Sequence, residues 1–152
     1  LNPEATFFQH HSSTMPGTEL PWVMASGASA VSDVRIEVNL RGEMNSDSES
    51  PAEPAGEPAA STSGKIEAEK FDLRLHFGVP TPMQEGVRVF DVYVQGERVL
   101  EDVTLDPADE AQARTVTETL ESIPISDTLH VHFDAKQGSP VISGIEIVRR
   151  GE

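Results

Sequence analysis

The sequence predicts an all-β fold, an antiparallel β-sandwich or jelly roll built around a single core. Several short segments alternate apolar and polar residues with a period of two, which is typical of half-buried strands. Glycine and proline turns separate these segments, and one acidic stretch rich in Ser, Pro, Ala and Glu interrupts them. A chain of 152 residues is near the usual size of one domain. One sandwich is therefore the simplest architecture.

Five segments carry the alternation. The predicted strands lie within 33–40, 71–77, 90–95, 129–134 and a last segment that contains Ile145 and Ile147. Gly96-Glu97 makes a turn into Arg98-Val99-Leu100, and Gly138-Ser139-Pro140 breaks the chain before the last strand. Six phenylalanines, mostly at strand positions, are expected mainly in the core.

The segment 106–120 is compatible with two local structures. Asp106-Pro107 can begin a helix, whereas Thr115, Val116, Thr117 and Thr119 favour a strand. We expect a loop or one helical turn, followed by a strand.

The acidic stretch at 41–64 is predicted to be a disordered insertion. It contains prolines, like charges and almost no large apolar side chains, so little burial offsets the entropy lost on ordering. The segment before it, about 40 residues, is too short for a core of its own without disulfides or metal. We therefore predict one domain, 1–152, interrupted by the insertion.

The charge balance limits the partners. A formal charge of -15 with scattered basic residues argues against nucleic acid and against anionic membranes. No apolar window is long enough to span a membrane, and no signal peptide begins the chain. Because the first residue is Leu1, we expect the chain to be a piece of a longer protein. There is no cysteine, so disulfides and thiolate metal sites are excluded.

Two runs and a closing strand carry a family resemblance. The run Phe71–Phe77 is followed by Arg88–Val103, which contains Phe90-Asp91-Val92 and the Gly96 turn, and Val141–Ile147 closes the pattern. In order and spacing these segments resemble the malectin family. The resemblance implies a β-sandwich of the galactose-binding-like class and a noncatalytic carbohydrate-binding role.

A weaker resemblance, at Leu20–Val23 and Val34–Ile36, is to malectin-like modules of large secreted or cell-envelope proteins of environmental bacteria. It implies a secreted or envelope location, an extracellular ligand such as a carbohydrate, and neighbouring domains of a parent protein as partners. The sequence departs from sugar-binding malectins at two loops. Sugar-binding malectins have an aromatic pair that stacks on the sugar at the position of Thr81-Pro82. They also have a carboxylate that accepts hydrogen bonds from sugar hydroxyls near the position of Gly138-Ser139.

Sugar binding requires an exposed aromatic ring beside polar groups. Tyr93 lies on the polar side of its predicted strand with Asp91 and Gln95, and Trp22 is the only tryptophan. These four residues are the candidate ligand-binding residues, while packing inside the sandwich is the alternative role for both rings. A structural module that only docks onto a neighbouring domain or chain remains the alternative function.

An enzymatic alternative uses His130 and His132, whose spacing on a strand lets two imidazoles reach one metal, as in a cupin. A cupin adds a Glu shortly after the pair and a distant third His, and neither is present here, so only Asp134 or the upstream His76 could complete the ligand set. A solvated strand face is the simpler interpretation of the pair, and likewise His10-His11 is expected at a surface strand end.

Other catalytic or cofactor sites have less support. The carboxylates Asp102, Asp106, Asp109 and Glu110 lack EF-hand spacing and are expected to cap turns. There is no nucleophile elbow, dinucleotide fingerprint or phosphate loop. We therefore expect neither an enzyme nor a cofactor.

Overall fold

The structure, a computed structural model, describes residues 1–15, 18–38, 68–80, 86–108 and 115–151. The predicted disordered insertion at 41–64 lies outside these residues. So do Thr81-Pro82, Asp109 and Glu110.

Antiparallel strands account for most of the described chain, and the two helical pieces are single turns. The elements in order are β1 (Thr6–Gln9), the 3-10 turn η1 (Ser12–Thr14), α1 (Pro21–Met24), β2 (Ser26–Ser29), β3 (Asp33–Glu37), β4 (Glu69–Gly78), β5 (Arg88–Val94), β6 (Glu97–Leu105), β7 (Thr115–Ile125), β8 (Thr128–Gln137), β9 (Val141–Ile142) and β10 (Gly144–Arg149).

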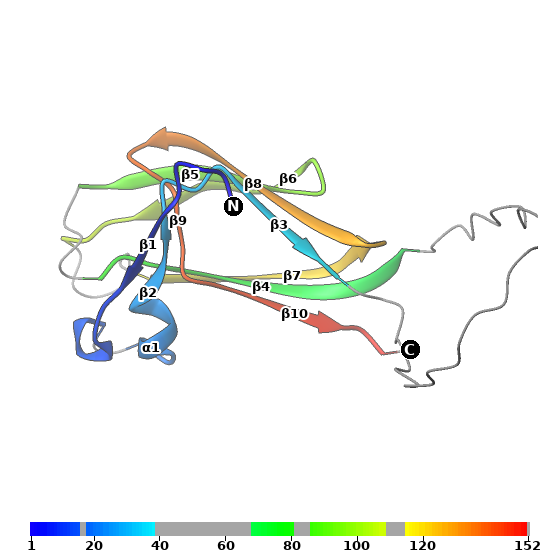
Figure 1. Cartoon of the computed structure of the whole chain (residues 1–152), viewed down its shortest axis with the longest axis horizontal. Coiled ribbons are helices and arrows are strands. Elements are labelled where there is room, and N and C mark those ends of the chain that lie inside the picture. Colours follow the sequence, from blue (N-terminus) through cyan, green and yellow to red (C-terminus); the bar gives the residue numbers. More distant parts are fainter. Residues whose placement is uncertain (16–17, 39–67, 81–85, 109–114, 152) are drawn as a thin grey trace, which may run out of the picture.

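The strands form three antiparallel sheets, with orders β3-β8-β5-β6, β10-β4-β7 and β1-β2-β9. Figure 1 shows the first two sheets stacked as the layers of a sandwich, with β1, β2 and β9 running across one end from layer to layer. The all-β sandwich predicted from the sequence is therefore confirmed. The small third sheet was not predicted.

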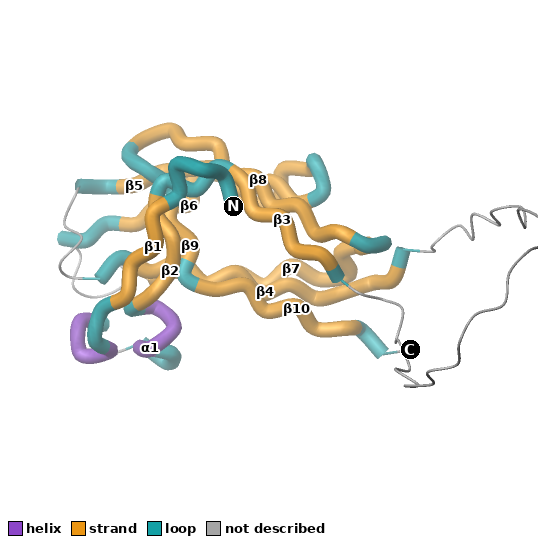
Figure 2. Tube along the Cα trace, in the orientation of Figure 1, coloured by secondary structure: helices purple, strands orange, loops and turns teal. Residues whose placement is uncertain are grey.

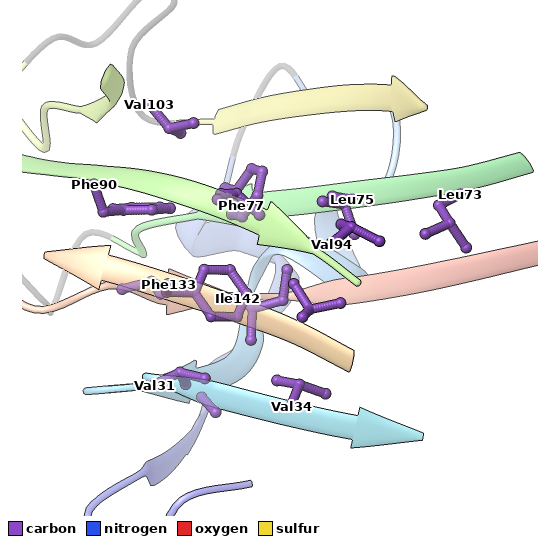
Figure 3. Close-up of a cluster of buried hydrophobic side chains, with 14 of the residues drawn as sticks. Val31, Val34, Leu73, Leu75, Phe77, Phe90, Val94, Val103, Phe133 and Ile142 are labelled. Atoms are coloured by element: carbon purple, nitrogen blue, oxygen red, sulfur yellow. The ribbon is translucent and has the colours of Figure 1, made fainter. Parts of the chain in front are cut away.

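The core lies between the two larger sheets. Alternate residues of β4, β5 and β8 point inward, among them Phe77, Phe90 and Phe133 (Figure 3). The Phe90 ring meets Phe77 edge-on at a centroid distance of 5.5 Å and Phe133 at 6.1 Å. Ala28, Val31 and Val34, which precede the insertion, belong to the same buried cluster. The single domain spanning 1–152 stays a prediction.

Two residues that the alternation places on solvent faces are buried. Asp91 is 2% exposed because Lys136 of β8 and Arg98 of β6 cover it from the neighbouring strands. His76 is also 2% exposed, since the segment that leads into α1 lies over its part of β4. No helix in the described part of the chain is long and apolar enough to cross a membrane.

Candidate functional site

The sandwich is open along one side, where β3 and β10 are the edge strands of their sheets. A groove of about 630 Å³ lies here. Val34 and Ile36 of β3 line one wall, and Gly144 and Ile145 of β10 line the other. The sheet β1-β2-β9 closes one end of the groove. Figure 2 shows these three strands at that end of the sandwich. We call this feature the edge groove.

The register of the small sheet explains how its side chains reach the edge groove. Phe7 of β1 is opposite Ala28 of β2, and Ala28 is opposite Ile142 of β9. Residues directly opposite in an antiparallel pair project from the same face of the sheet. Ala28 and Ile142 are buried and form the floor. Phe7, on the outermost strand, is 74% exposed, so its ring stands at the rim. It is therefore an exception to the prediction that the phenylalanines lie in the core.

Three polar residues line the same groove. Gln9 is opposite Ser26 in the register, so both project from the face that carries Phe7. The Ser26 hydroxyl donates to the carbonyls of Trp22 and Val23, each at 3.3 Å, and its lone pairs remain to accept. The buried Ser143 hydroxyl has no hydrogen-bond partner within the described part of the chain.

An apolar floor, an exposed aromatic ring and a few polar groups are the composition of a small-molecule site. The volume of the edge groove also falls within the usual range for such sites. A flat apolar molecule with hydroxyls at its edge fits this arrangement: Phe7 offers the ring face, Gln9 both donors and an acceptor, and Ser26 an acceptor. A buried hydroxyl without a partner, such as that of Ser143, gains when a ligand or water completes its hydrogen bonds.

The sequence-predicted residues lie in other places. Tyr93 lies on the outer side of β5, where its ring contacts the His132 ring at a centroid distance of 5.8 Å, and Gln95 lies in the turn that follows β5. The Gln95 side chain donates to the Thr128 carbonyl at 2.9 Å. Tyr93 is half-buried, and neither residue lines the edge groove.

Asp91, which was expected beside Tyr93, faces internal partners. Its Oδ1 accepts from the backbone N–H of Asp102 at 2.9 Å and from Lys136 Nζ at 2.9 Å. Arg98 Nη1 lies 3.6 Å from Oδ2. The backbone N–H of Asp102, followed by Lys136, holds the pKa of the Asp91 carboxyl below its usual range. These interactions give Asp91 a role within the fold.

Trp22 lies on α1, which packs against β2 and β4, and its side chain is 68% exposed. Its backbone carbonyl accepts from the Ser26 hydroxyl of the edge groove, but the ring does not line that groove. The four predicted residues therefore belong to two separate surfaces and the interior.

The two histidines of β8 converge on one carboxylate. His130 Nε2 and His132 Nδ1 lie 3.1 and 3.2 Å from Asp33 Oδ1. A carboxylate only accepts, so both facing nitrogens carry protons and cannot offer lone pairs there. The Ser32 hydroxyl is the largest cause that lowers the pKa of Asp33, and His132 and His130 add to it. Among the described residues, no group of three or more His, Cys, Asp or Glu is arranged to hold a metal ion.

His76 and Asp134 were the other two candidate metal ligands. His76 belongs to the other large sheet, and Asp134 is paired in the register with Asp91. Of the turn carboxylates, Asp106 accepts from the backbone N–H of Ala108 at 2.8 Å, as a turn cap does. Asp102 pairs with Lys136 at 2.6 Å. His11 caps the η1 turn at the surface.

In the loop between β8 and β9, the Ser139 carbonyl accepts from Arg88 Nη1 at 2.7 Å. Gly138 adopts a φ of 66°, which glycine tolerates at no steric cost. This loop therefore presents a backbone turn held by Arg88 at the position where sugar-binding relatives were expected to present a carboxylate.

A family model described as the malectin domain matches residues 65–145, slightly more than half of the chain. No curated protein matches the chain.

Among solved structures, a calcium-binding mutant of Bacteroides uniformis β-glucuronidase 2 is 11% identical and superposes with a TM-score of 0.63 over 97% of this chain. The same enzyme covalently bound to cyclophellitol-6-carboxylate aziridine is 12% identical, with a TM-score of 0.61 over 97% of this chain. A further Bacteroides uniformis β-glucuronidase is 14% identical, with a TM-score of 0.53 over 86%. The chain spans only 12 to 14% of these enzymes, so the likeness concerns the fold of one part of them.

Proposed function

The chain belongs to the malectin domain family, and on that premise we propose that it is a noncatalytic module that binds carbohydrate in the edge groove. The malectin domain is a binding module of the carbohydrate type, not a catalytic one. The β-glucuronidase likeness supports a sandwich module and no reaction, because it covers a small part of those enzymes at low identity.

The observation that carries the proposal is the exposed ring of Phe7 beside Gln9 and Ser26. The ring, 74% exposed, continues the apolar lining of the edge groove, and a ligand that covers it removes this apolar surface from water. A pyranose has an apolar face that covers a phenyl ring and hydroxyls that reach the polar groups beside it. Gln9 and Ser26 provide such groups on the same face of the small sheet.

Titration calorimetry with linear glucose oligomers, preceded by a glycan array to select the ligand, tests the proposal. We expect Phe7→Ala to weaken binding by roughly tenfold to a hundredfold, since burial of a phenyl ring contributes about 1.5–3 kcal/mol. Phe7→Trp should retain binding, because it keeps a flat apolar face.

Val148→Ala is the matched control, since Val148 is an exposed apolar residue, at 56%, that does not line the edge groove. It should leave the affinity unchanged. No binding of any arrayed saccharide at millimolar concentration, or equal loss in Phe7→Ala and Val148→Ala, would contradict sugar binding in this groove.

A docking function is the second candidate, and the exposure of Trp22 favours it. Exposed aromatic side chains outside a ligand groove are typical anchors of protein interfaces. Trp22→Ala separates the two functions: a sugar site in the edge groove is unaffected by this change, whereas a docking surface centred on α1 is lost. Saccharide binding by the wild type that Trp22→Ala leaves unchanged supports the edge groove, whereas the absence of saccharide binding in the wild type supports docking.

A further inference from the structure

We propose that the chain has a second ligand site, a half-enclosed polar pocket around His76, and that it takes a neutral polyhydroxylated compound. The pocket has a volume of about 520 Å³ and lies between the strands β4 and β7 and the segment before α1. We call it the His76 pocket. Its polar lining comes from Thr18, Glu19, Arg74, His76, Thr115 and Thr117.

The alternation of β4 separates the two sites. Leu75 and Phe77 point into the core, so Arg74 and His76 project from the opposite face of the sheet. The edge groove opens from the core side and shares no lining residue with the His76 pocket. Close approach of α1 encloses the pocket, since a Cβ added at Gly78 would meet the Met24 carbonyl oxygen at 2.8 Å.

A chain of hydrogen bonds fixes the polar groups of this pocket. His76 Nδ1 lies 3.2 Å from Thr117 Oγ1, and His76 Nε2 lies 2.9 Å from Glu146 Oε1. Glu146 Oε2 accepts from Arg74 Nη1 at 3.2 Å. The His76 side chain is only 3% exposed, so its two hydrogen bonds are held within the fold, whereas Arg74 and Glu146 are 51% and 42% exposed. Glu146 lies on β10, the strand beside β4, and acts as a positioning residue that does not line the pocket.

The direction of each hydrogen bond determines what the pocket offers. The Glu146 carboxylate only accepts, so His76 Nε2 carries the proton in that bond, and in the neutral ring Nδ1 accepts from the Thr117 hydroxyl. The Thr18 hydroxyl donates to the Met15 carbonyl at 3.3 Å. The lone pairs of both threonine oxygens are thus left to accept. Arg74 uses one donor on Glu146 and has others.

The ligand that matches these hydrogen-bonding groups carries several adjacent hydroxyls. Threonine oxygens and the Glu19 carboxylate accept hydrogen bonds, and the Arg74 guanidinium donates to hydroxyl oxygens. An anion is disfavoured, because Glu146 already neutralises Arg74, Glu19 adds a negative charge, and the whole chain carries -15. Leu20 and Met24 supply an apolar wall. A saccharide residue with vicinal hydroxyls and no carboxylate meets all of these conditions.

Histidine side-chain NMR reports on this pocket separately from the edge groove. The chain has five histidines, and only His76 lines the His76 pocket, whereas none lines the edge groove. Maltose is added to the wild-type chain and to the Phe7→Ala variant, and the imidazole ring signals are followed. We expect the His76 signals to shift in both proteins, with those of His130 and His132 unchanged.

Matched threonines on β7 test the hydrogen-bonding role. Thr117→Val removes a pocket hydroxyl. We expect the affinity for maltose, measured from the shift of the His76 signals, to fall by roughly five- to tenfold, which is the factor for one hydrogen bond. Thr119→Val is the control, because Thr119 projects from the same face of β7 but does not line the pocket. Arg74→Gln replaces Thr117→Val if the latter does not fold, with the same expected loss. Glucose and glucuronate are compared in the same NMR assay, and glucuronate should bind more weakly because of its charge.

Three results would overturn the second site: His76 signals that maltose does not shift, equal loss in Thr117→Val and Thr119→Val, or stronger binding of glucuronate than of glucose. Failure of the edge groove is a different result: the calorimetric isotherm of Phe7→Ala would then match that of the wild type in both the number of sites and the affinity, because the His76 pocket is intact in both proteins. The two proposals can therefore fail independently.

Discussion

Removal of the Phe90 side chain should destabilise the fold strongly, and its surroundings set the magnitude. Its side chain is fully buried between the two larger sheets, with edge-on contacts to Phe77 and Phe133. Truncating a buried Phe to Ala costs about 3–5 kcal/mol through lost transfer energy and the cavity left behind. Each lost aromatic pair contributes about 0.5–1.5 kcal/mol beyond burial, which places Phe90→Ala in the upper half of that range.

Urea unfolding followed by circular dichroism measures this cost. For an m-value of about 2 kcal/mol/M, a loss of about 4 kcal/mol lowers the midpoint by about 2 M at unchanged m. Phe7→Ala makes the same chemical change at a 74% exposed ring, so it should alter the free energy of unfolding by less than about 0.5 kcal/mol. A cost below about 1.5 kcal/mol for Phe90→Ala, or similar costs for the two variants, would refute the core described here.

Two further predictions concern the sandwich. Lys136→Met removes an ion-pair partner of Asp91, whose lowered carboxyl pKa stabilises the fold above about pH 4 and ceases to do so as pH falls through the folded-state pKa. In this variant the pKa of the Asp91 carboxyl should rise, and acid unfolding should begin at higher pH. An unchanged Asp91 pKa in a carboxyl NMR titration would contradict this. Gly27→Ala brings a Cβ against the Ile142 carbonyl oxygen, so thermal unfolding should show a loss of about 1–3 kcal/mol. Gly151→Ala, with open space around it, should show none.

The larger strands were predictable because their alternation is strong and local. Leu73, Leu75 and Phe77 on β4 and Leu129, Val131 and Phe133 on β8 keep period two and are buried as expected. The strand β7 also begins at Thr115, where threonine and valine favour strand over helix.

The small sheet was not predictable from local pattern. Its strand β2 reads Ser26-Gly27-Ala28-Ser29, which has no β-branched or aromatic residue, and its partner β9 has only two residues. Such strands exist because of pairing across more than a hundred residues, as between Ala28 and Ile142. Tertiary pairing of this kind overrides local propensity.

The same limit applies to the candidate sites. Phe7 is one of six phenylalanines, and only the position of β1 at the sheet edge makes its ring exposed. His76 has the pattern of a solvated strand residue, and only the segment leading into α1 turns it into a pocket wall. Asp91 was expected at the surface, but partners from β6 and β8 bury it. Alternation thus identifies strand faces but does not reveal what covers them.

The most direct test of a carbohydrate site in the edge groove is the affinity of glucose oligomers for wild type, Phe7→Ala and Val148→Ala, measured side by side by calorimetry. The wild type and Val148→Ala should bind alike, and Phe7→Ala should bind roughly tenfold to a hundredfold more weakly in this groove at nearly unchanged stability. Unchanged affinity in a folded Phe7→Ala variant would contradict the edge groove as the carbohydrate site.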